Sequence, residues 1–593
     1  MKLEDSRRLT GPNLYSAKPG AVVQLVFSES DDPTAVERAW RMSVVHACER
    51  LGWPAPVLHA RHFQGPDGAR GAAFMLEGEL DRLFTSTEVN EWALGQAGLD
   101  PADAPDPLPS DLSALQAAAA EERARLGGLV RVVNEARARG VPWMLDDERL
   151  TLGRGRSSCG YEPARLPPSE AIPWSGLLTI PTVAITGTNG KTTCSRIVAA
   201  MARAAGHVGV GATSTDGIFV DGRLVDAGDW AGAGGTREVL RRADVSFAVL
   251  ETARGGLLRR GMGVERCDAV LVTNVDRDHM GDYGVHDLET MAAVKGILTR
   301  AVNPRGAVVL GVDSPALHDW AAGRALEGRL IWFGLDPSHP TLVEHLRGGG
   351  EAWTVESETL VRRVGERVET VVATRELAFA LGGAARFQVA NALGAAALAH
   401  AAGVGIDAIA TALRQFGASP EDNPGRLQVW SVPARVEDET VSIPLVIDFA
   451  HNEAGISAVA ELLGPRRHDA VVCFGMAGDR DDEALESLGR ALRAFEARAV
   501  VLREQPGYLR GRAPGEIPAR LEAGMRREAD ALGAGVPCDS EVESLERAVA
   551  LAGREGCVAL LIHVERGPVA AWLERRGARR CKGDEAWAWL RRG

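Results

Sequence analysis

The sequence lacks several features that mark particular classes of protein. It contains no run of 18 apolar residues, which argues against a membrane-spanning helix, and its start, MKLEDSRRLTGPN, has no apolar core of a signal peptide. Its eight cysteines include no C-x-x-C pair, so we expect neither a disulfide framework nor a zinc site. Its net charge of −13 argues against non-specific nucleic-acid binding and against a basic membrane-surface protein. These absences predict a cytoplasmic protein with reduced thiols.

Lysine is also scarce, because only five of the 67 basic residues are lysines. The chain uses arginine almost wherever it needs a positive charge, so a retained lysine draws attention. Lysine offers a compact charge and, when neutral, a nucleophilic amine that a guanidinium cannot supply. We interpret Lys2, Lys18 and Lys582 as chance survivors. Lys191 lies in a glycine-rich loop, and Lys295 lies in a helical pattern where a solvated surface lysine is the alternative interpretation.

The chain of 593 residues is too long for one hydrophobic core, so we expect three or four domains. We place an N-terminal α+β domain at 1–165, a central domain at 171–425 and a C-terminal domain at 426–593. The central region alternates apolar strands, from TVAITG to LIWFGL, with helices, which predicts a mostly parallel sheet covered on both faces. An alternating pattern at 353–381 predicts a small antiparallel patch. The strands LVIDFA, AVVCFG, AVVLR and ALLIHV predict a second, smaller doubly wound α/β domain.

The segment AITGTNGKTT combines an apolar strand, a glycine turn, a lysine and two threonines. The common phosphate-loop spacing is G-x-x-x-x-G-K-[ST], but here Ile185 occupies the first glycine position and the glycine is Gly187. Gly187 and Gly190 permit a tight turn, and backbone N–H groups at a helix start suit an anion. Lys191 would neutralise β- and γ-phosphates, and the Thr192 hydroxyl would hold Mg²⁺. A plain strand–turn–helix is the alternative.

Polar residues follow two further strands of the central region. Glu251 ends the strand VSFAVLE, and Asn274 is near the end of AVLVTNV, followed by Asp278 and His279. Because the carboxyl ends of parallel strands share one edge of a sheet, these side chains are candidate ligands for the metal of a triphosphate. Arg254, three residues after Glu251, is a candidate clamp for a carboxylate. For each of these residues taken alone, the alternative interpretation is a polar loop residue whose hydrogen bonds are satisfied and which binds nothing.

These motifs carry a family resemblance. TGTNGKTT, VLET, TNVDRDHMGDYG, the later lysine, ANA, NPGR and IDFAHNEAG resemble, in order and spacing, the motifs of the Mur ligase superfamily. STDGIFVDG, ETARGGLLRRGMG and LRGRAPGEI are most similar to the cyanophycin synthetases within it. The resemblance covers about 171–593, and LTGPN and VPWMLDDERLTLGRGRSS extend it to the first region. The ATP-grasp domain that separates these parts in cyanophycin synthetases is missing between them here.

The resemblance implies a P-loop Mur ligase central domain, a Rossmann-like C-terminal domain, and roles for individual residues. The residues implied to bind ATP are Gly187, Thr188, Asn189, Gly190, Lys191, Thr192, Thr193, Asn391 (at the adenine), Arg426 and Asp448. The implied Mg²⁺ ligands are Thr192, Glu251, His279 and Lys295, the last matching a lysine that many Mur ligases carbamylate. The implied catalytic residues are Lys191, Glu251, Asn274, His279 and Lys295. The implied substrate contacts are Thr215, Asp216 and Arg254 on the acyl side, Arg512 and Glu516 on the amine side, and His451.

Three departures from the family pattern affect these expectations. Phe387 and Gln388 replace the first polar residues of an H-N-x-x-N motif, and only Asn391 is kept. Phe449 stands where tyrosine is common. The helix that carries His and Glu in some cyanophycin synthetases is STEVNEWALGQAG here, so we expect no metal-dependent hydrolysis from the N-terminal domain.

The function expected from this resemblance is an ADP-forming, ATP-dependent amide ligase with ATP and Mg²⁺. It would activate a carboxylate, such as an aspartate side chain or a peptide, as an acyl phosphate for attack by an amino acid amine. Cyanophycin synthetases use this half to join arginine to aspartate side chains. We expect a homo-oligomer that either adds one residue to a carboxylate or works beside a separate ATP-grasp protein, and an N-terminal domain that docks a substrate or partner. The alternatives are a non-catalytic ATP-binding scaffold or subunit of such a partner, and a generic P-loop ATPase.

Overall fold

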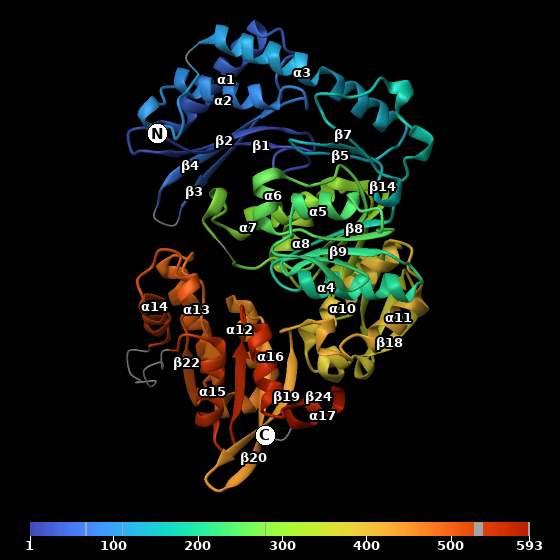
Figure 1. Cartoon of the computed structure of the whole chain (residues 1–593), viewed down its shortest axis with the longest axis vertical. Helices are drawn as coiled ribbons and strands as arrows, with labels where there is room; N and C mark the ends of the chain where they lie inside the picture. The colour runs from blue at the N-terminus through green and yellow to red at the C-terminus, as the bar shows by residue number, and fades with distance from the viewer. Residues whose placement is uncertain (66–67, 110, 279, 527–537, 591–593) are drawn as a thin grey trace.

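The computed structural model describes residues 1–65, 68–109, 111–278, 280–526 and 538–590. In these residues four β-sheets are arranged along the long axis of the molecule, with the N-terminal sheets at one end and the C-terminal sheet at the other (Figure 1). Within the described segments, none of the helices combines the length and the hydropathy needed to cross a bilayer. All eight cysteines lie within these residues and are free thiols.

The N-terminal region contains a four-stranded antiparallel sheet in the order β1-β2-β4-β3 and a three-stranded sheet in the order β5-β6-β7. Helices α1, α2 and α3 cover the outer face of the larger sheet (Figure 1). The elements are β1 (Lys2–Leu9), β2 (Gly20–Phe27), α1 (Pro33–Arg50), β3 (Leu58–Gln64), β4 (Arg70–Glu77), α2 (Leu83–Gln96), α3 (Leu112–Ala138), β5 (Trp143–Leu145), β6 (Leu150–Leu152) and β7 (Cys159–Tyr161). The α+β character predicted for this region is confirmed.

The central sheet has eleven strands in the order β11-β10-β9-β12-β8-β13-β14-β15-β16-β17-β18. The strands from β9 to β16 in that order run parallel, and antiparallel strands complete both edges. They are β8 (Thr182–Thr186), β9 (Val210–Ser214), β10 (Gly217–Val220), β11 (Arg223–Ala227), β12 (Phe247–Glu251), β13 (Cys267–Val272), β14 (Val302–Gly311), β15 (Arg329–Phe333), β16 (Glu351–Glu356), β17 (Thr359–Val364) and β18 (Arg367–Ala373). The mostly parallel sheet is confirmed, and the predicted antiparallel patch continues this sheet at one edge.

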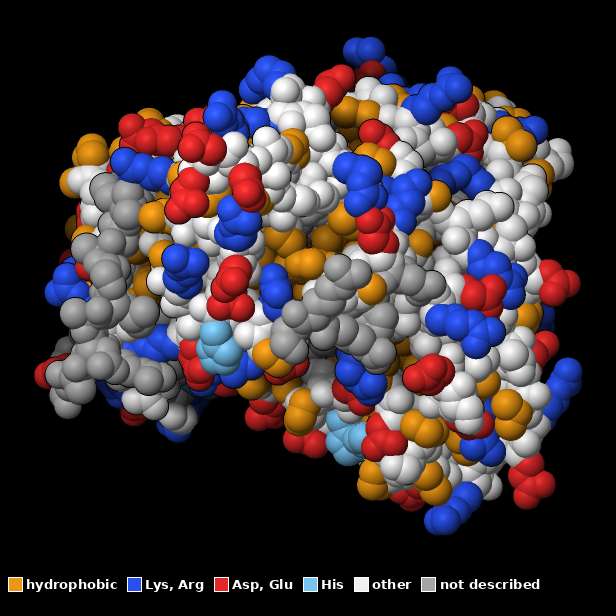
Figure 2. Space-filling model, turned by 90° about the horizontal axis from the view of Figure 1, so that it is seen from below, with side chains coloured by type: hydrophobic (Ala, Val, Ile, Leu, Met, Phe, Trp, Pro, Cys, Tyr) orange, Lys and Arg blue, Asp and Glu red, His pale blue; other side chains and the backbone are white. Residues whose placement is uncertain are grey.

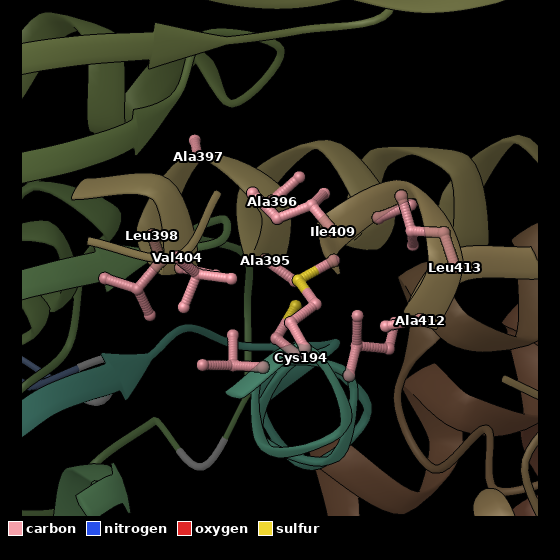
Figure 3. Close-up of a cluster of buried hydrophobic side chains, with 14 of the residues drawn as sticks. Cys194, Ala395, Ala396, Ala397, Leu398, Val404, Ile409, Ala412 and Leu413 are labelled. Atoms are coloured by element: carbon pink, nitrogen blue, oxygen red, sulfur yellow. The ribbon is translucent and has the colours of Figure 1, made fainter. Parts of the chain in front are cut away.

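Helices cover both faces of the central sheet, as alternate residues of β8 illustrate. Val183 and Ile185 pack into the core beneath α4, α10 and α11, whereas Ala184 packs into the core beneath α5 to α8. These helices are α4 (Lys191–Ala204), α5 (Ala233–Arg241), α6 (Arg254–Arg260), α7 (Leu288–Lys295), α8 (Pro315–Ala321), α9 (Pro340–Arg347), α10 (Arg386–Ala401) and α11 (Ile406–Gln415). Figure 3 shows Cys194 of α4 facing small alanine side chains, which allow the helices to approach closely and fix the start of α4.

The C-terminal sheet has six strands in the order β22-β21-β23-β20-β19-β24, and the first four run parallel. Its elements are β19 (Gln428–Val436), β20 (Glu439–Asp448), α12 (Glu453–Leu463), β21 (Ala470–Phe474), α13 (Asp482–Leu492), β22 (Ala499–Leu502), α14 (Glu516–Met525), α15 (Glu541–Ala552), β23 (Cys557–Leu561), α16 (Arg566–Arg575), β24 (Arg579–Cys581) and α17 (Gly583–Leu590). Figure 2, seen from this end, shows basic and acidic side chains interspersed. The Rossmann-like character is confirmed, while the three domain boundaries stay a prediction.

Candidate functional site

The glycine-rich loop joins β8 to α4 and depends on two glycines. Gly187 has φ +153° and Gly190 has φ +85°, in the region that L side chains rarely adopt. A Cβ at 187 would lie 1.8 Å from Thr273 Oγ1, and one at 190 would lie 2.2 Å from Asn391 Oδ1. The loop can therefore take this path only with glycine at both positions, and its backbone N–H groups lie at the N-terminus of α4, where an anion is favoured.

The end of β13 holds the loop in place through side chains and backbone. Asn274 accepts hydrogen bonds from Thr188 N at its carbonyl oxygen (3.0 Å) and from Asn189 N at its Oδ1 (2.9 Å). Thr273 Oγ1 donates to the carbonyl oxygen of Asn189 at 2.6 Å. In the structure Asn274, predicted to be catalytic, thus fixes the shape of the phosphate loop.

Glu251 at the end of β12 is fully buried beside the start of α4. Thr192 Oγ1 donates to its Oε1 at 3.2 Å, and its Oε2 is buried without a hydrogen-bond partner among the described residues. Burial raises the pKa of Glu251 to about 7, although the charges of Lys191 and Arg426 act in the opposite direction. An orphaned carboxylate oxygen beside a threonine hydroxyl fits a hard cation such as Mg²⁺.

Lys191 and Lys295 lie close enough to influence each other. Lys191 Nζ donates to the carbonyl oxygens of Gly187 (3.0 Å) and Thr188 (2.9 Å). Lys295, at the end of α7, is only 4% exposed, and burial followed by the charge of Lys191 brings its pKa well below the usual lysine value. The carboxylate of Asp278 acts in the opposite direction.

One predicted metal ligand, His279, lies outside the described residues. In the segments that are described, no three His, Cys, Asp or Glu side chains form a metal-binding group on their own. Thr192 and Glu251 are therefore the predicted ligands whose contacts support a cation site. Lys191 lies near both Glu251 and Lys295, because its charge acts on the pKa of each, and the roles of all four residues stay predictions.

The C-terminal domain contacts this site through several polar links, of which two involve Asn189 and Asp278. Asn189 in the phosphate loop and Asn452 at the start of α12 exchange amide hydrogen bonds of 3.2 and 3.0 Å. Asp278 Oδ1 lies 3.0 Å from Nη2 of Arg480, and its Oδ2 lies 3.6 Å from Nε2 of His451. His451, predicted to contact substrate, thus lies at the domain interface, whereas sequence reasoning missed Asn452 and Arg480.

Asp216, in the turn between β9 and β10, is bound by three arginines. Its carboxylate lies 3.0 Å from Arg196, 3.1 Å from Arg426 and 2.6 Å from Arg566. Burial would raise the pKa of Asp216, but the three guanidinium groups hold it well below the usual range. The cluster joins α4, the segment that carries Arg426 between the two domains (the interdomain segment) and α16. Its three arginines and one carboxylate leave two positive charges in excess. Its neighbour Thr215 is exposed.

Asn391 and Asp448 are held by local hydrogen bonds. Asn391 lies directly behind Gly190, and its Nδ2 donates to Gln388 Oε1 at 3.1 Å. Asp448 Oδ2 accepts from Leu427 N at 2.9 Å, and burial raises the pKa of Asp448 to about 6. Contact of Asn391 with adenine and of Asp448 with ATP stay predictions.

Arg254 and Arg512 have different surroundings. Arg254 Nη2 is paired with Asp282, and its Nη1 is buried without a partner among the described residues. Arg512 is bound to Glu516 and to Asp482 (2.7 Å), and its Nε donates to the Gly478 carbonyl (3.1 Å). Nη1 of Arg254 is thus available to donate to an anion, whereas Arg512 and Glu516 support the segment that carries Arg480. The substrate roles of these three residues stay predictions.

The N-terminal sheet contacts the segment 280–286, which follows Asp278. Arg61 on β3 donates to the carbonyl oxygens of Gly284 (3.0 Å) and Tyr283 (3.1 Å). The guanidinium of Arg7 on β1 lies 4.5 Å from the centre of the Tyr283 ring. Tyr283 has φ +55°, so these contacts hold a strained backbone. The sequence carried no signal for them.

Comparison with known proteins shows which family the chain resembles. The family model of the Mur ligase middle domain matches residues 185–399, and that of the Mur ligase glutamate ligase domain matches 425–561. Cyanophycin synthetase from Crocosphaera subtropica is 35% identical over 352 residues, which are 59% of this chain but 39% of that protein. The chain therefore spans about two fifths of the length of this relative. UDP-N-acetylmuramoyl-L-alanyl-D-glutamate–2,6-diaminopimelate ligase from Caulobacter vibrioides is 29% identical over 365 residues, covering 58% of this chain and 70% of that ligase.

Among solved structures, a bifunctional folylpolyglutamate synthase/dihydrofolate synthase with Mn, AMPPNP and L-glutamate bound is similar to this chain. Its TM-score is 0.44 at 19% identity, and the match covers 66% of this chain and 89% of that structure. The two family models together match more than half of the chain, in the order in which the two domains occur. The chain therefore belongs to the Mur ligase superfamily.

Proposed function

We propose that the chain is an ADP-forming, ATP-dependent amide ligase that activates a carboxylate and joins it to an amine. The observation that carries the proposal is the phosphate loop at the start of α4 beside the orphaned Glu251 Oε2. Mur ligases and cyanophycin synthetases, to which the chain is similar, are ligases of this kind. Glu251 and Thr192 would hold Mg²⁺, together with His279 and Lys295 by the family resemblance. The ion would neutralise phosphate charge when bound.

The loop amides and Lys191 would bind the β- and γ-phosphates of ATP, which is a substrate of the reaction. The buried Nη1 of Arg254 would orient the acyl carboxylate for attack on the γ-phosphorus. Transfer of the phosphoryl group forms an acyl phosphate and releases ADP. The amine then attacks the carbonyl carbon, the C–O bond to phosphate breaks, and the ammonium proton is lost. Phosphate is thus the leaving group in place of oxide.

The substrates would be an amino acid and a carboxylate, such as an aspartate side chain or a peptide. Because the ATP-grasp domain of cyanophycin synthetases is not present between the N-terminal region and the Mur-ligase-like part that follows it, we propose a separate ATP-grasp protein as a partner. We further propose a homo-oligomer in the cytoplasm, where ATP and reduced thiols are maintained.

Release of phosphate distinguishes this function from its alternatives. If the chain is a ligase, phosphate release should depend on both a carboxylate and an amine. A screen of amino acids and aspartate-containing peptides would measure this dependence. Release with neither substrate would instead indicate a generic ATPase. No release under any condition would indicate an ATP-binding scaffold.

Replacing Lys295 by arginine is expected to lower ADP formation about 100-fold. Burial lowers the pKa of Lys295 well below the usual lysine value and so favours the neutral amine, which is the form that reacts with CO₂ to give a carbamate, whereas arginine keeps its charge. The measurement is coupled ADP release with and without added bicarbonate, with thermal denaturation as the check on folding. Bicarbonate should stimulate the parent protein only. Full activity in Lys295→Arg would remove the carbamate from the proposal.

Replacing Arg61 by alanine is expected to lower turnover about tenfold while the KM for ATP is unchanged. Arg61 holds the backbone of Tyr283 and Gly284, five and six residues after Asp278, so its loss would release this segment. Steady-state kinetics would measure the effect. Arg70→Ala is the matched control, because the acceptors of Arg70 on β4 among the described residues are Ser28, Glu29 and Asp31 of the same N-terminal region. Equal losses in both variants would contradict a role in positioning the site.

A further inference from the structure

Two kinds of contact join the C-terminal domain to the central domain. The first is apolar and lies near the end of the chain, where α17 packs on the central domain and Leu590 shares a buried cluster with Leu381 and Ala385. Arg580 on β24 reinforces it, since its Nη2 donates to the carbonyl oxygen of Gly417 at 2.9 Å. Exposing apolar surface is costly, so this contact would persist if the two domains moved apart, and it would act as their pivot.

The second contact is ionic and centres on Asp216 of the central domain. Its Oδ1 lies 2.6 Å from Nη1 of Arg566 on α16, and its Oδ2 lies 3.1 Å from Nη1 of Arg426 in the interdomain segment. Arg196 on α4, which lies 3.0 Å from the same Oδ2, belongs to the central domain itself. Two of these three pairs therefore tie the central domain to the C-terminal part of the chain, and the third does not.

Asp216 is poorly suited to the acyl contact that the family resemblance implies. Both of its carboxylate oxygens are paired with arginines, and its side chain is only 16% exposed. The acyl substrate of the proposed reaction is itself a carboxylate, which a second carboxylate would repel. The contacts of Asp216 therefore indicate a role within the protein rather than on the substrate.

Arg426 is the partner through which Asp216 reaches the reaction site. The charge of Arg426 acts on the pKa of Glu251, so the guanidinium lies near the proposed cation site, and the resemblance implies that Arg426 binds ATP. Burial lowers the pKa of Arg426, Asp216 raises it, and the charges of the other two arginines lower it. Without Asp216, the three guanidinium groups would repel one another across the domain interface.

We infer that Asp216 is a positioning residue whose pairs with Arg426 and Arg566, here called the latch, hold the C-terminal domain docked before nucleotide binds. The latch keeps Arg426 in place for ATP, and Asp216 acts through the arginines instead of touching the acyl substrate. The apolar contact of α17 keeps the two domains together at the pivot, so loss of the latch would open the interface without separating them. The link to ATP rests on the proposed ligase function, whereas docking of the domains can be measured without catalysis.

The test is small-angle X-ray scattering of the full chain without nucleotide, which measures the radius of gyration. The parent should already be docked, so AMPPNP with Mg²⁺ should leave its radius unchanged. Asp216→Asn keeps the shape of the side chain but removes the charge, and it should raise the radius by about 2 Å above the roughly 25 Å of a compact chain of this length. Arg566→Gln should do the same. Arg196→Gln is the matched control, because it removes a partner of the same carboxylate within one domain, and it should keep the parent radius.

Nucleotide affinity gives a second readout, which a merely structural role would not move in this way. A ligand that binds only the docked form loses apparent affinity in proportion to the docked fraction. With about a tenth of the Asp216→Asn molecules docked, the Kd for AMPPNP should rise about tenfold, and saturating AMPPNP should restore the parent radius. In an active assay the KM for ATP should rise equally, while the KM for the carboxylate stays unchanged. Asp216→Glu keeps the charge and should recover most of the affinity.

The outcomes separate the latch from the proposed function. Contraction of the parent on AMPPNP, an Asp216→Asn chain as compact as the parent, or equal expansion in Arg196→Gln and Arg566→Gln would overturn the latch. So would a higher KM for the carboxylate with an unchanged KM for ATP, because Asp216 would then be a substrate contact. A radius that depends on Asp216, with no ADP release under any condition, would keep the latch and refute the ligase. ADP release together with any of the overturning results would do the reverse.

Discussion

Replacing Lys191 by alanine is expected to lower ADP formation by about 10³-fold while the chain stays folded. In the structure Lys191 Nζ donates to the carbonyl oxygens of Gly187 and Thr188, at 3.0 and 2.9 Å. A phosphate in the loop would provide a stronger, charged acceptor at the same place. Because Lys191 is the first residue of α4, alanine preserves the helix and removes the charge together with these two hydrogen bonds.

The same substitution also changes the two buried groups nearby. The charge of Lys191 lowers the pKa of both Glu251 and Lys295, so its loss should raise both values. The coupled ADP assay should therefore be run from pH 6 to 9. Lys18→Ala is the matched control, since Lys18 is 74% exposed and lies 3.6 Å from Glu77. Substantial ADP formation by Lys191→Ala at any pH in this range would contradict the proposed phosphate site.

The phosphate loop and the strand ends could be predicted because each depends on consecutive residues. The loop needs an apolar strand, two glycines and a helix start in one segment, and Glu251 directly ends a buried strand. Parallel pairing of β12 and β13 with β8 then brings Glu251 and Asn274 to the loop. Local chemistry and the geometry of a parallel sheet therefore specify this part of the site.

The contacts between domains could not be predicted, because their partners are far apart in the chain. Arg566 lies 350 positions after Asp216, and Asn452 lies 263 positions after Asn189. An arginine at a helix start or an asparagine at an N-cap has an adequate local explanation, so neither indicates a distant partner. Three arginines on one carboxylate become visible only once α4, α16 and the interdomain segment are adjacent.

The edge strand β11 was also beyond the sequence pattern. All five residues of β11 are exposed, so it shows neither the continuous apolar run of a buried strand nor an alternating one. It belongs to the sheet only through its antiparallel pairing with β10. A strand of this kind is specified by its neighbour, which explains why the central sheet is wider than the pattern predicted.

Replacing Glu251 by glutamine is expected to lower ADP formation by 10² to 10³-fold and, without ATP and Mg²⁺, to stabilise the fold at pH 8. Burial raises the pKa of Glu251 to about 7, whereas an unfolded chain titrates near 4.5. The folded state therefore binds this proton more tightly. Stability that is present below pH 4.5 is lost as the pH rises to 7, by at most about 3 kcal/mol.

Denaturant unfolding at pH 5 and pH 8 measures this difference. Glutamine carries no charge and can still accept from Thr192 Oγ1, so Glu251→Gln should gain stability over the parent at pH 8 and little at pH 5. Glu351→Gln is the control of opposite sign. Burial would raise the pKa of Glu351, but hydrogen bonds from Arg362 and Trp353 hold it below its usual value. The contribution of Glu351 is lost only as the pH falls below about 4.5, so that control should lose stability at both pH 5 and pH 8. A Glu251→Gln variant less stable than the parent at pH 8 would show that the carboxylate is already satisfied, which would remove the argument for a cation beside the phosphate loop.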